Sequence, residues 1–121
     1  STLVTVGISE VFGSEEEPIV EILAGCVIGA KDDPMLYRYL LRTDELTEEL
    51  FSSIFTFWSI EANDEPGKID VYVKAYLQIN SAEEAELGAR IEGVSQTADS
   101  YDDHLQKKFG GQRVQEWANF D

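Results

Sequence analysis

Apolar residues recur at strand-like spacing in the first quarter of the chain. In residues 2–12 they are separated by small or polar residues, and they are Leu3, Val4, Val6, Ile8 and Val11. Residues 18–30 form a second apolar run of similar length, and the short connection 13–17 contains a glycine. A short connection between two strands favours antiparallel pairing. The pattern therefore predicts a β-hairpin over residues 2–30.

A helix is expected after this hairpin. Asp33 is a good N-cap, and Pro34 suits the first helical position. Leu36, Tyr39 and Leu40 then share one face of the helix. The helix either continues through residues 44–50 or ends at Thr43 and restarts.

Two further strands follow, with a turn at residues 63–68. Residues 51–62 have apolar groups on both faces, which is typical of a central strand. Residues 69–79 alternate strictly, so one face is expected to be dry and lined by Ile69, Val71, Val73, Ala75, Leu77 and Ile79. The other face presents Tyr72 and Tyr76, which lie two steps apart on the strand and are expected to form a shallow aromatic surface.

The last predicted element is a long helix. Ser81 and Glu84 form a capping box at its start, and Gly110 and Gly111 supply the C-cap after Lys107 and Lys108. A continuous apolar stripe runs between the two ends, made of Leu87, Ile91, Val94, Ala98, Tyr101, Leu105 and Phe109. At roughly 40 Å, such a helix is longer than the strands, so part of its stripe is expected to extend beyond the sheet and to form a dimer contact.

Together these elements predict one α+β domain over residues 1–121. Its antiparallel sheet has about four or five strands, with helices on one face, and the order is β-β-α-β-β-α with a long C-terminal helix. A chain of 121 residues supports a single core. Residues 112–121 are expected to be a tail that either folds back onto the domain or docks on another chain.

Charge restricts the partners. The chain has 24 acidic and 9 basic residues, a formal net charge of −15 and a pI near 4.2. Nucleic acids and anionic membranes are therefore not expected as partners, whereas a basic or amphipathic protein segment is. Solubility alone also explains such a charge. One cysteine, no signal-peptide pattern and no apolar run long enough to span a membrane predict a soluble cytoplasmic protein.

The chemistry-bearing residues do not predict an enzyme. Asp99, Asp102, Asp103 and His104 lie close together on the last helix, but a catalytic zinc site needs about three protein ligands and the chain has one histidine. The glycine-rich, serine-hydrolase and zinc-protease motifs are missing from the sequence. Cys26 lies in an apolar run and is expected to be a small buried hydrophobic residue. No catalytic residue, metal or cofactor is predicted.

The run TADSYDDHLQKKFGGQR, residues 97–113, resembles the closing helix of the bacterial YbjN-like and type III secretion chaperone-like proteins. The matching positions are Thr97, Ala98, Asp99, Asp102, Asp103, Phe109, Gly110 and Gly111. The predicted element order is also similar to the core of that fold, although the family has a leading helix that this chain does not show. The resemblance implies a homodimeric, noncatalytic chaperone that holds a segment of another protein on exposed apolar patches.

The residues expected to contact such a client lie on the open face of the sheet. They are Phe55, Phe57, Tyr72 and Tyr76, and a client strand could also pair with an exposed sheet edge. The same aromatic residues could instead pack under the tail or in a dimer interface. Two other functions fit the charge: an acidic decoy that mimics nucleic acid and binds a basic protein, and a domain adapted to high salt.

Overall fold

The structure is a computed structural model that describes residues 3–47, 56–78 and 84–114. Its elements follow the predicted order, with one short strand added at the end. They are β1 (Val4–Gly13), β2 (Pro18–Lys31), α1 (Pro34–Thr47), β3 (Thr56–Ala62), β4 (Lys68–Gln78), α2 (Glu84–Phe109) and β5 (Gln112–Arg113). The predicted α+β fold with a long C-terminal helix is confirmed.

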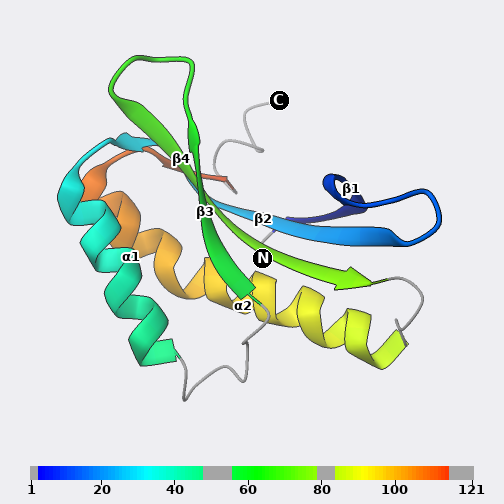
Figure 1. Cartoon of the computed structure of the whole chain (residues 1–121). Helices are drawn as coiled ribbons and strands as arrows, with labels where there is room; N and C mark the ends of the chain where they lie inside the picture. Colours follow the sequence, from blue (N-terminus) through cyan, green and yellow to red (C-terminus); the bar gives the residue numbers. More distant parts are fainter. Residues whose placement is uncertain (1–2, 48–55, 79–83, 115–121) are drawn as a thin grey trace.

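All pairings in the sheet are antiparallel, and the strand order is β1-β2-β4-β3 (Figure 1). β5 also pairs with β2, so β1 and β5 share one edge of that long strand. β1 occupies the part of this edge up to Ala24, and β5 lies opposite Val27 and Ile28. The start of the predicted tail is therefore an edge strand of the sheet.

The prediction that residues 51–62 form a central strand is wrong. In the described residues β3 pairs with β4 alone and lies at the edge of the sheet. Its apolar residues occupy both faces for another reason: Trp58 packs toward the helices, whereas Phe57 stacks on a tyrosine of the opposite face. Phe55 and the rest of residues 51–55 lie outside the described residues.

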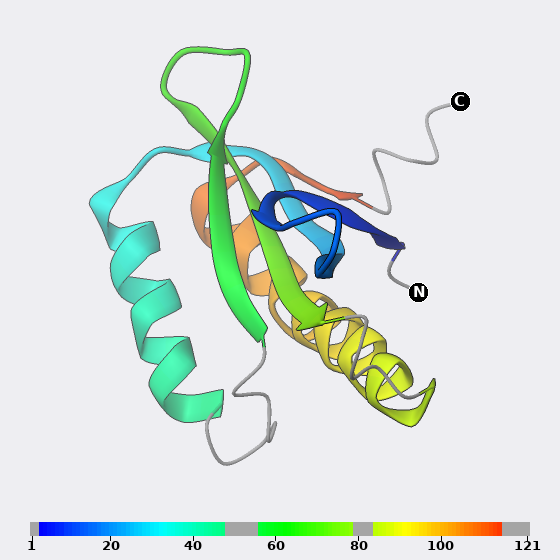
Figure 2. The same cartoon turned by 45° about the vertical axis from the view of Figure 1, so that its right-hand side comes forward.

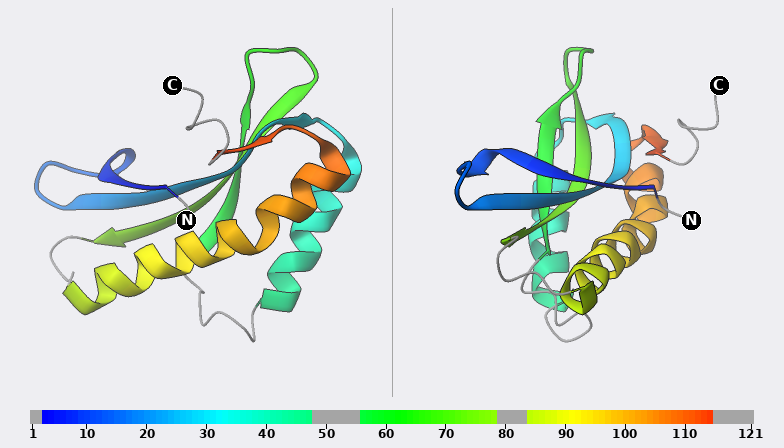
Figure 3. Two further views of the ribbon diagram at one scale, coloured as in Figure 1. Left: turned by 180° about the vertical axis from the view of Figure 1, so that it is seen from behind. Right: turned by 90° about the vertical axis from the view of Figure 1, so that its right-hand side faces the viewer.

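Both helices cover the same face of the sheet, as the views in Figures 2 and 3 show. The core lies between them and the sheet. Leu36 and Leu40 of α1 pack there with Leu105 and Phe109 of α2 against β2 and β4. Further along α2, Val94 and Ala98 pack on Ile22, Ala24, Val73 and Ala75. Burying these aliphatic side chains is the main force that holds the layers together.

The caps at the start of α1 and at the end of α2 follow the sequence, whereas the predicted capping box at Ser81 lies outside the described residues. The Met35 N–H donates to Asp33 Oδ1 at 2.9 Å, which satisfies a free donor at the start of α1. α1 continues to Thr47 without a break at Thr43. At the end of α2, Gly110 and Gly111 have φ angles of 77° and 87°, in the left-handed region that glycine adopts without strain.

Gly111 also allows β5 to approach β2. A Cβ at this position would meet the Ile28 carbonyl oxygen at 2.6 Å, well inside contact distance. The Arg113 guanidinium then pairs with Asp103 of α2, with 2.7 Å between Nη1 and Oδ1. The end of α2 is thus joined to the sheet edge through both backbone and side-chain contacts.

Candidate functional site

The candidate site is the face of the sheet opposite α1 and α2, here called the outer face. Strict alternation along β4 creates it, because the odd-numbered residues from Ile69 to Leu77 are buried under the helices. The even-numbered residues therefore point to the outer face. They are Asp70, Tyr72, Lys74, Tyr76 and Gln78, as the sequence predicts.

Three aromatic rings meet at one end of the outer face, and we call them the aromatic strip: Phe12, Phe57 and Tyr76. The Tyr76 ring stacks on Phe57 with centroids 5.5 Å apart, and it meets Phe12 edge to face at 5.0 Å. Such pairs add about 0.5–1.5 kcal/mol each beyond the area that they bury. Phe57 and Phe12 nonetheless stay 41% and 54% exposed. The strip is thus ordered by internal contacts and still accessible.

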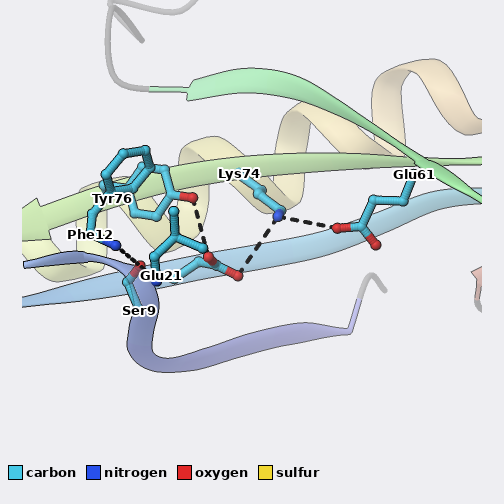
Figure 4. A network of polar contacts seen from close by, with 7 residues as sticks. Ser9, Phe12, Glu21, Glu61, Lys74 and Tyr76 are labelled. Carbon is cyan, nitrogen blue, oxygen red and sulfur yellow. Dashed lines mark hydrogen bonds and ion pairs between the residues drawn. The ribbon is translucent and has the colours of Figure 1, made fainter.

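Phe12 is the member of the strip that sequence reasoning missed. The register between β1 and β2 shifts between Ile8 and Gly13, so strict alternation fails there. The backbone N–H groups of Val11 and Phe12 donate to Ser9 Oγ at 3.2 and 3.0 Å and hold this irregularity (Figure 4). A Ser-x-x-Phe sequence before a glycine turn is the only local signal for it.

A network of charged groups borders the strip (Figure 4). Tyr76 donates its hydroxyl to Glu21 Oε2 at 3.2 Å, and Lys74 Nζ lies 3.9 Å from Glu21 and 3.3 Å from Glu61. Burial raises the pKa of Tyr76, and the neighbouring Glu21 carboxylate raises it further. Tyr76 therefore stays protonated and donates to Glu21 over the whole physiological range.

Tyr72 lines a separate cleft of about 390 Å³ on the outer face, here called the Tyr72 cleft. Its apolar walls include Leu3, Leu23 and Val114, and its polar end includes Asp64 and Asp70. Burial raises the pKa of the Tyr72 hydroxyl, and Asp70 and Glu61 add to the effect. The cleft thus combines an apolar wall with a region of negative potential.

β1 leaves apolar side chains exposed along a sheet edge. Val6, Ile8 and Val11 are 44%, 60% and 77% exposed. β2 is the one partner of β1 within the described part of the chain, so the far edge of β1 is unpaired there. Residues 4–9 also contain no charge and no proline, the usual protection of edge strands.

Two acids near His104, Asp102 and Asp103, make separate local contacts. Asp103 pairs with Arg113, and the half-exposed remainder of that carboxylate faces solvent. Asp102 is buried, and its Oδ1 accepts the Asp103 N–H at 2.7 Å. Burial raises the pKa of Asp102, with a smaller contribution from the charge of Asp103. Among the residues that the structure describes, no three potential metal ligands cluster.

Cys26 is fully buried in the core, and its thiol faces the Ala98 carbonyl oxygen at 3.5 Å. Burial raises the pKa of the thiol strongly, with smaller contributions from Asp102 and Asp99. A thiol in this state is a weak nucleophile. The prediction of a small buried hydrophobic residue is confirmed.

The apolar stripe of α2 faces the sheet of its own chain. Val94, Ala98, Leu105 and Phe109 are buried, and Leu87, Ile91 and Tyr101 pack against the two core clusters while keeping part of their surface accessible. The accessible parts of these three residues remain for a contact with a second chain, and two of the three, Leu87 and Ile91, lie in the first third of the helix.

No protein-family model matches the chain, and a search of curated proteins finds no match either. Among the described residues, neither helix combines the length and the apolar character that crossing a bilayer requires. Exposed apolar and aromatic groups lie on the outer face and along the edge of β1.

Proposed function

We propose that the protein is a noncatalytic binding module that holds an extended segment of another protein. The segment pairs with the free edge of β1, and its side chains reach the aromatic strip. The observation that supports this most is the position of Phe12, which belongs to β1 and contacts Tyr76 of the strip. Phe12 therefore connects the free edge of β1 with the exposed rings of the outer face.

The edge of β1 has the properties of a strand-addition site. An unpaired edge offers backbone donors and acceptors in a row, and an incoming strand gains main-chain hydrogen bonds there. Val6 and Ile8 lie on the same side of β1 as the buried face of the sheet, because Val6 is opposite Ile22. Alternate apolar side chains of the added strand would extend that buried layer.

Charge defines the partner's chemistry. The net charge of −15 attracts basic segments over a Debye length of about 8–10 Å and repels acidic ones. Glu21 and Glu61 lie beside the aromatic strip and act at shorter range. We therefore propose a partner segment that alternates apolar with basic side chains. Such a partner fits the chaperone role that the resemblance of residues 97–113 implies, and we place this role in the cytoplasm.

Selection from a random peptide library tests the proposal. The full chain is expected to enrich peptides that alternate apolar and basic residues, and Ile8→Lys is expected to abolish the enrichment. A lysine there repels a basic strand and protects the edge. Leu41→Lys is the matched control, because Leu41 is 66% exposed on α1 and its substitution should leave the enrichment unchanged. Equal enrichment by the Ile8→Lys and original chains would contradict the proposed site.

The resemblance also implies a homodimer, and we propose that its contact uses the accessible parts of Leu87 and Ile91. Sedimentation of the chain at increasing concentration measures the association, and Leu87→Lys is expected to shift it toward the monomer. A monomer at every concentration would contradict the dimer without affecting the peptide-binding surface.

A further inference from the structure

The Tyr72 cleft lies on the same face as the aromatic strip and is separated from it along β4 by Lys74. We propose that this cleft receives a Lys or Arg side chain of the bound partner. The inference rests on the proposed function for the source of that side chain. The expected affinity of the cleft for a cationic side chain follows from the residues that line it, and it does not depend on the proposed function.

The size and apolar walls of the cleft suit a long aliphatic stem. Its volume of about 390 Å³ lies at the lower end of the range for small-molecule pockets, about 300–1,000 Å³. Leu23 and Val114 line it, and Gly25 lets Val114 pack closely against β2, because a Cβ at Gly25 would collide with the Val114 side chain. Lys and Arg bury such stems against apolar surface and keep the charged end near solvent or acids.

The polar end of the cleft offers acceptors for a cation. Of the described residues that line the cleft, Asp64 and Asp70 are acidic and none is basic. Asp70 accepts the Gly29 N–H at 2.9 Å and the Asn63 side-chain amide at 2.8 Å, and both bonds end at Oδ1. Those bonds fix the carboxylate in place while Oδ2 can accept a further donor. The Tyr72 ring beside it adds a face that attracts cations.

The same face already holds a lysine in this way. Lys74 is 14% exposed in its side chain and lies between the carboxylates of Glu21 and Glu61. Its position shows that a lysine side chain can be largely buried on the outer face with its ammonium group near two acids. The Tyr72 cleft has the apolar wall and the acids, and it lacks an internal cation among its described lining residues. A cation from the partner completes the pattern.

Titration of the full chain with small probes, followed by NMR, tests the inference. The probes are N-acetyl-arginine amide and N-acetyl-lysine amide, with N-acetyl-norleucine amide as an uncharged probe of similar stem length. The cationic probes are expected to shift the Leu23 and Val114 methyl signals and the Tyr72 ring signals saturably. The norleucine probe is expected to bind at least about tenfold more weakly, because it lacks the charge-assisted hydrogen bonds.

Variants separate the cleft from general attraction to an acidic chain. Asp70→Asn keeps an oxygen for Gly29 and should weaken the arginine probe about tenfold. Leu23→Lys places a cation of the chain at the cleft and should also block the probe. Glu16→Gln, in the exposed acidic turn before β2, removes the same charge and should change nothing. Shifts of equal size at residues 15–17 and at the cleft, or binding unaffected by Asp70→Asn and Leu23→Lys, would overturn the inference.

The two proposals fail separately. If the arginine probe binds the cleft and the peptide library shows no enrichment, the cation pocket stands and the proposed function is wrong. If the library is enriched and the probe does not bind the cleft, the function stands and the basic side chains of the partner must contact other acids.

Discussion

The two faces of β4 share one backbone and differ in almost everything else. The odd-numbered side chains from Ile69 to Leu77 are aliphatic and lie under α1 and α2, and the even-numbered ones are polar or aromatic and point away from these two helices. On the covered face, affinity between layers comes from apolar area. On the outer face, each side chain is held by one or two specific contacts, such as the bond from Tyr76 to Glu21.

This difference separates stability from recognition. A substitution on the covered face removes packing that many neighbours share, so the whole fold responds. A substitution on the outer face affects a few contacts and leaves the core intact. The outer face and the edge of β1 can therefore carry binding residues that contribute little to folding.

The largest expected effect tests the covered face. Leu105→Asp places a charge among Leu36, Cys26 and Val71, where Leu105 has no exposed surface. The substitution is expected to cost several kcal/mol, a large share of the typical 5–15 kcal/mol of a small domain, and to unfold most of the chain. Chemical denaturation followed by circular dichroism measures it.

His104→Asp is the matched control for Leu105→Asp. His104 is the preceding residue on α2 and is exposed, so a new aspartate there is expected to change the free energy of unfolding by less than about 0.5 kcal/mol. Similar losses for the two variants would mean that the charge itself, and not its burial, destabilises the chain.

The covered face was the predictable part of the molecule. The alternation in residues 69–79 and the stripe of α2 both arise because one face of each element is buried. Burial of one face produces a regular spacing of apolar residues that the sequence shows directly. The edge position of β3 was not predictable, because an apolar residue such as Phe57 gives the same pattern whether it packs in a second layer or on a neighbouring ring. The pairing of β5 with β2 depends on a two-residue segment, which has no periodicity.

The next effect tests the close contact between Gly25 of β2 and the Val114 side chain that follows β5. Gly25 lies within β2, and a Cβ there would collide with the Val114 side chain. Gly25→Ala is therefore expected to destabilise the fold by about 1–3 kcal/mol, the usual cost of overpacking. Thermal or chemical unfolding measures the loss.

A second substitution identifies the cause of that loss. Val114→Ala removes the atoms in the way, so the double variant Gly25→Ala with Val114→Ala is expected to recover most of the stability. Additive losses in the double variant would show that Gly25 is required by the backbone of β2 and not by the approach of Val114.

The outer face was predictable only in part. Tyr72 and Tyr76 follow from alternation, and the network that orders Tyr76 does not, because it joins residues from β2, β3 and β4 through side chains. The position of Phe12 depends on a shift of register between β1 and β2. The Tyr72 cleft depends on Val114, which lies far from β4 in the sequence. Long-range placement of this kind leaves no local pattern.

The smallest expected effect is a pH-dependent change in stability on substitution of Asp102, which lies at the boundary between the covered face and solvent. Asp102 is a buried carboxylate at the rim of the covered face, and burial raises its pKa above the ordinary value of 3.8. A raised pKa in the folded state favours folding below the ordinary pKa, and this contribution is lost as pH rises through the folded value. At neutral pH the ionised Asp102 is therefore a net cost. Asp102→Asn, whose side-chain oxygen can still accept the Asp103 N–H, is expected to raise the unfolding midpoint at neutral pH.

The gain from Asp102→Asn is expected to shrink as the pH falls toward 3.8, because the original carboxylate becomes neutral there. Glu92→Gln on the same helix is the control. Glu92 is exposed, and its substitution removes the same charge and keeps an acceptor for Gln96. This variant therefore measures the effect of the lower net charge alone. Unfolding midpoints of the three chains across this pH range measure the difference. A gain for Asp102→Asn that equals that for Glu92→Gln at every pH would mean that net charge and not burial sets the effect. Water would then screen the charge of Asp102 as it screens the charges of the outer face.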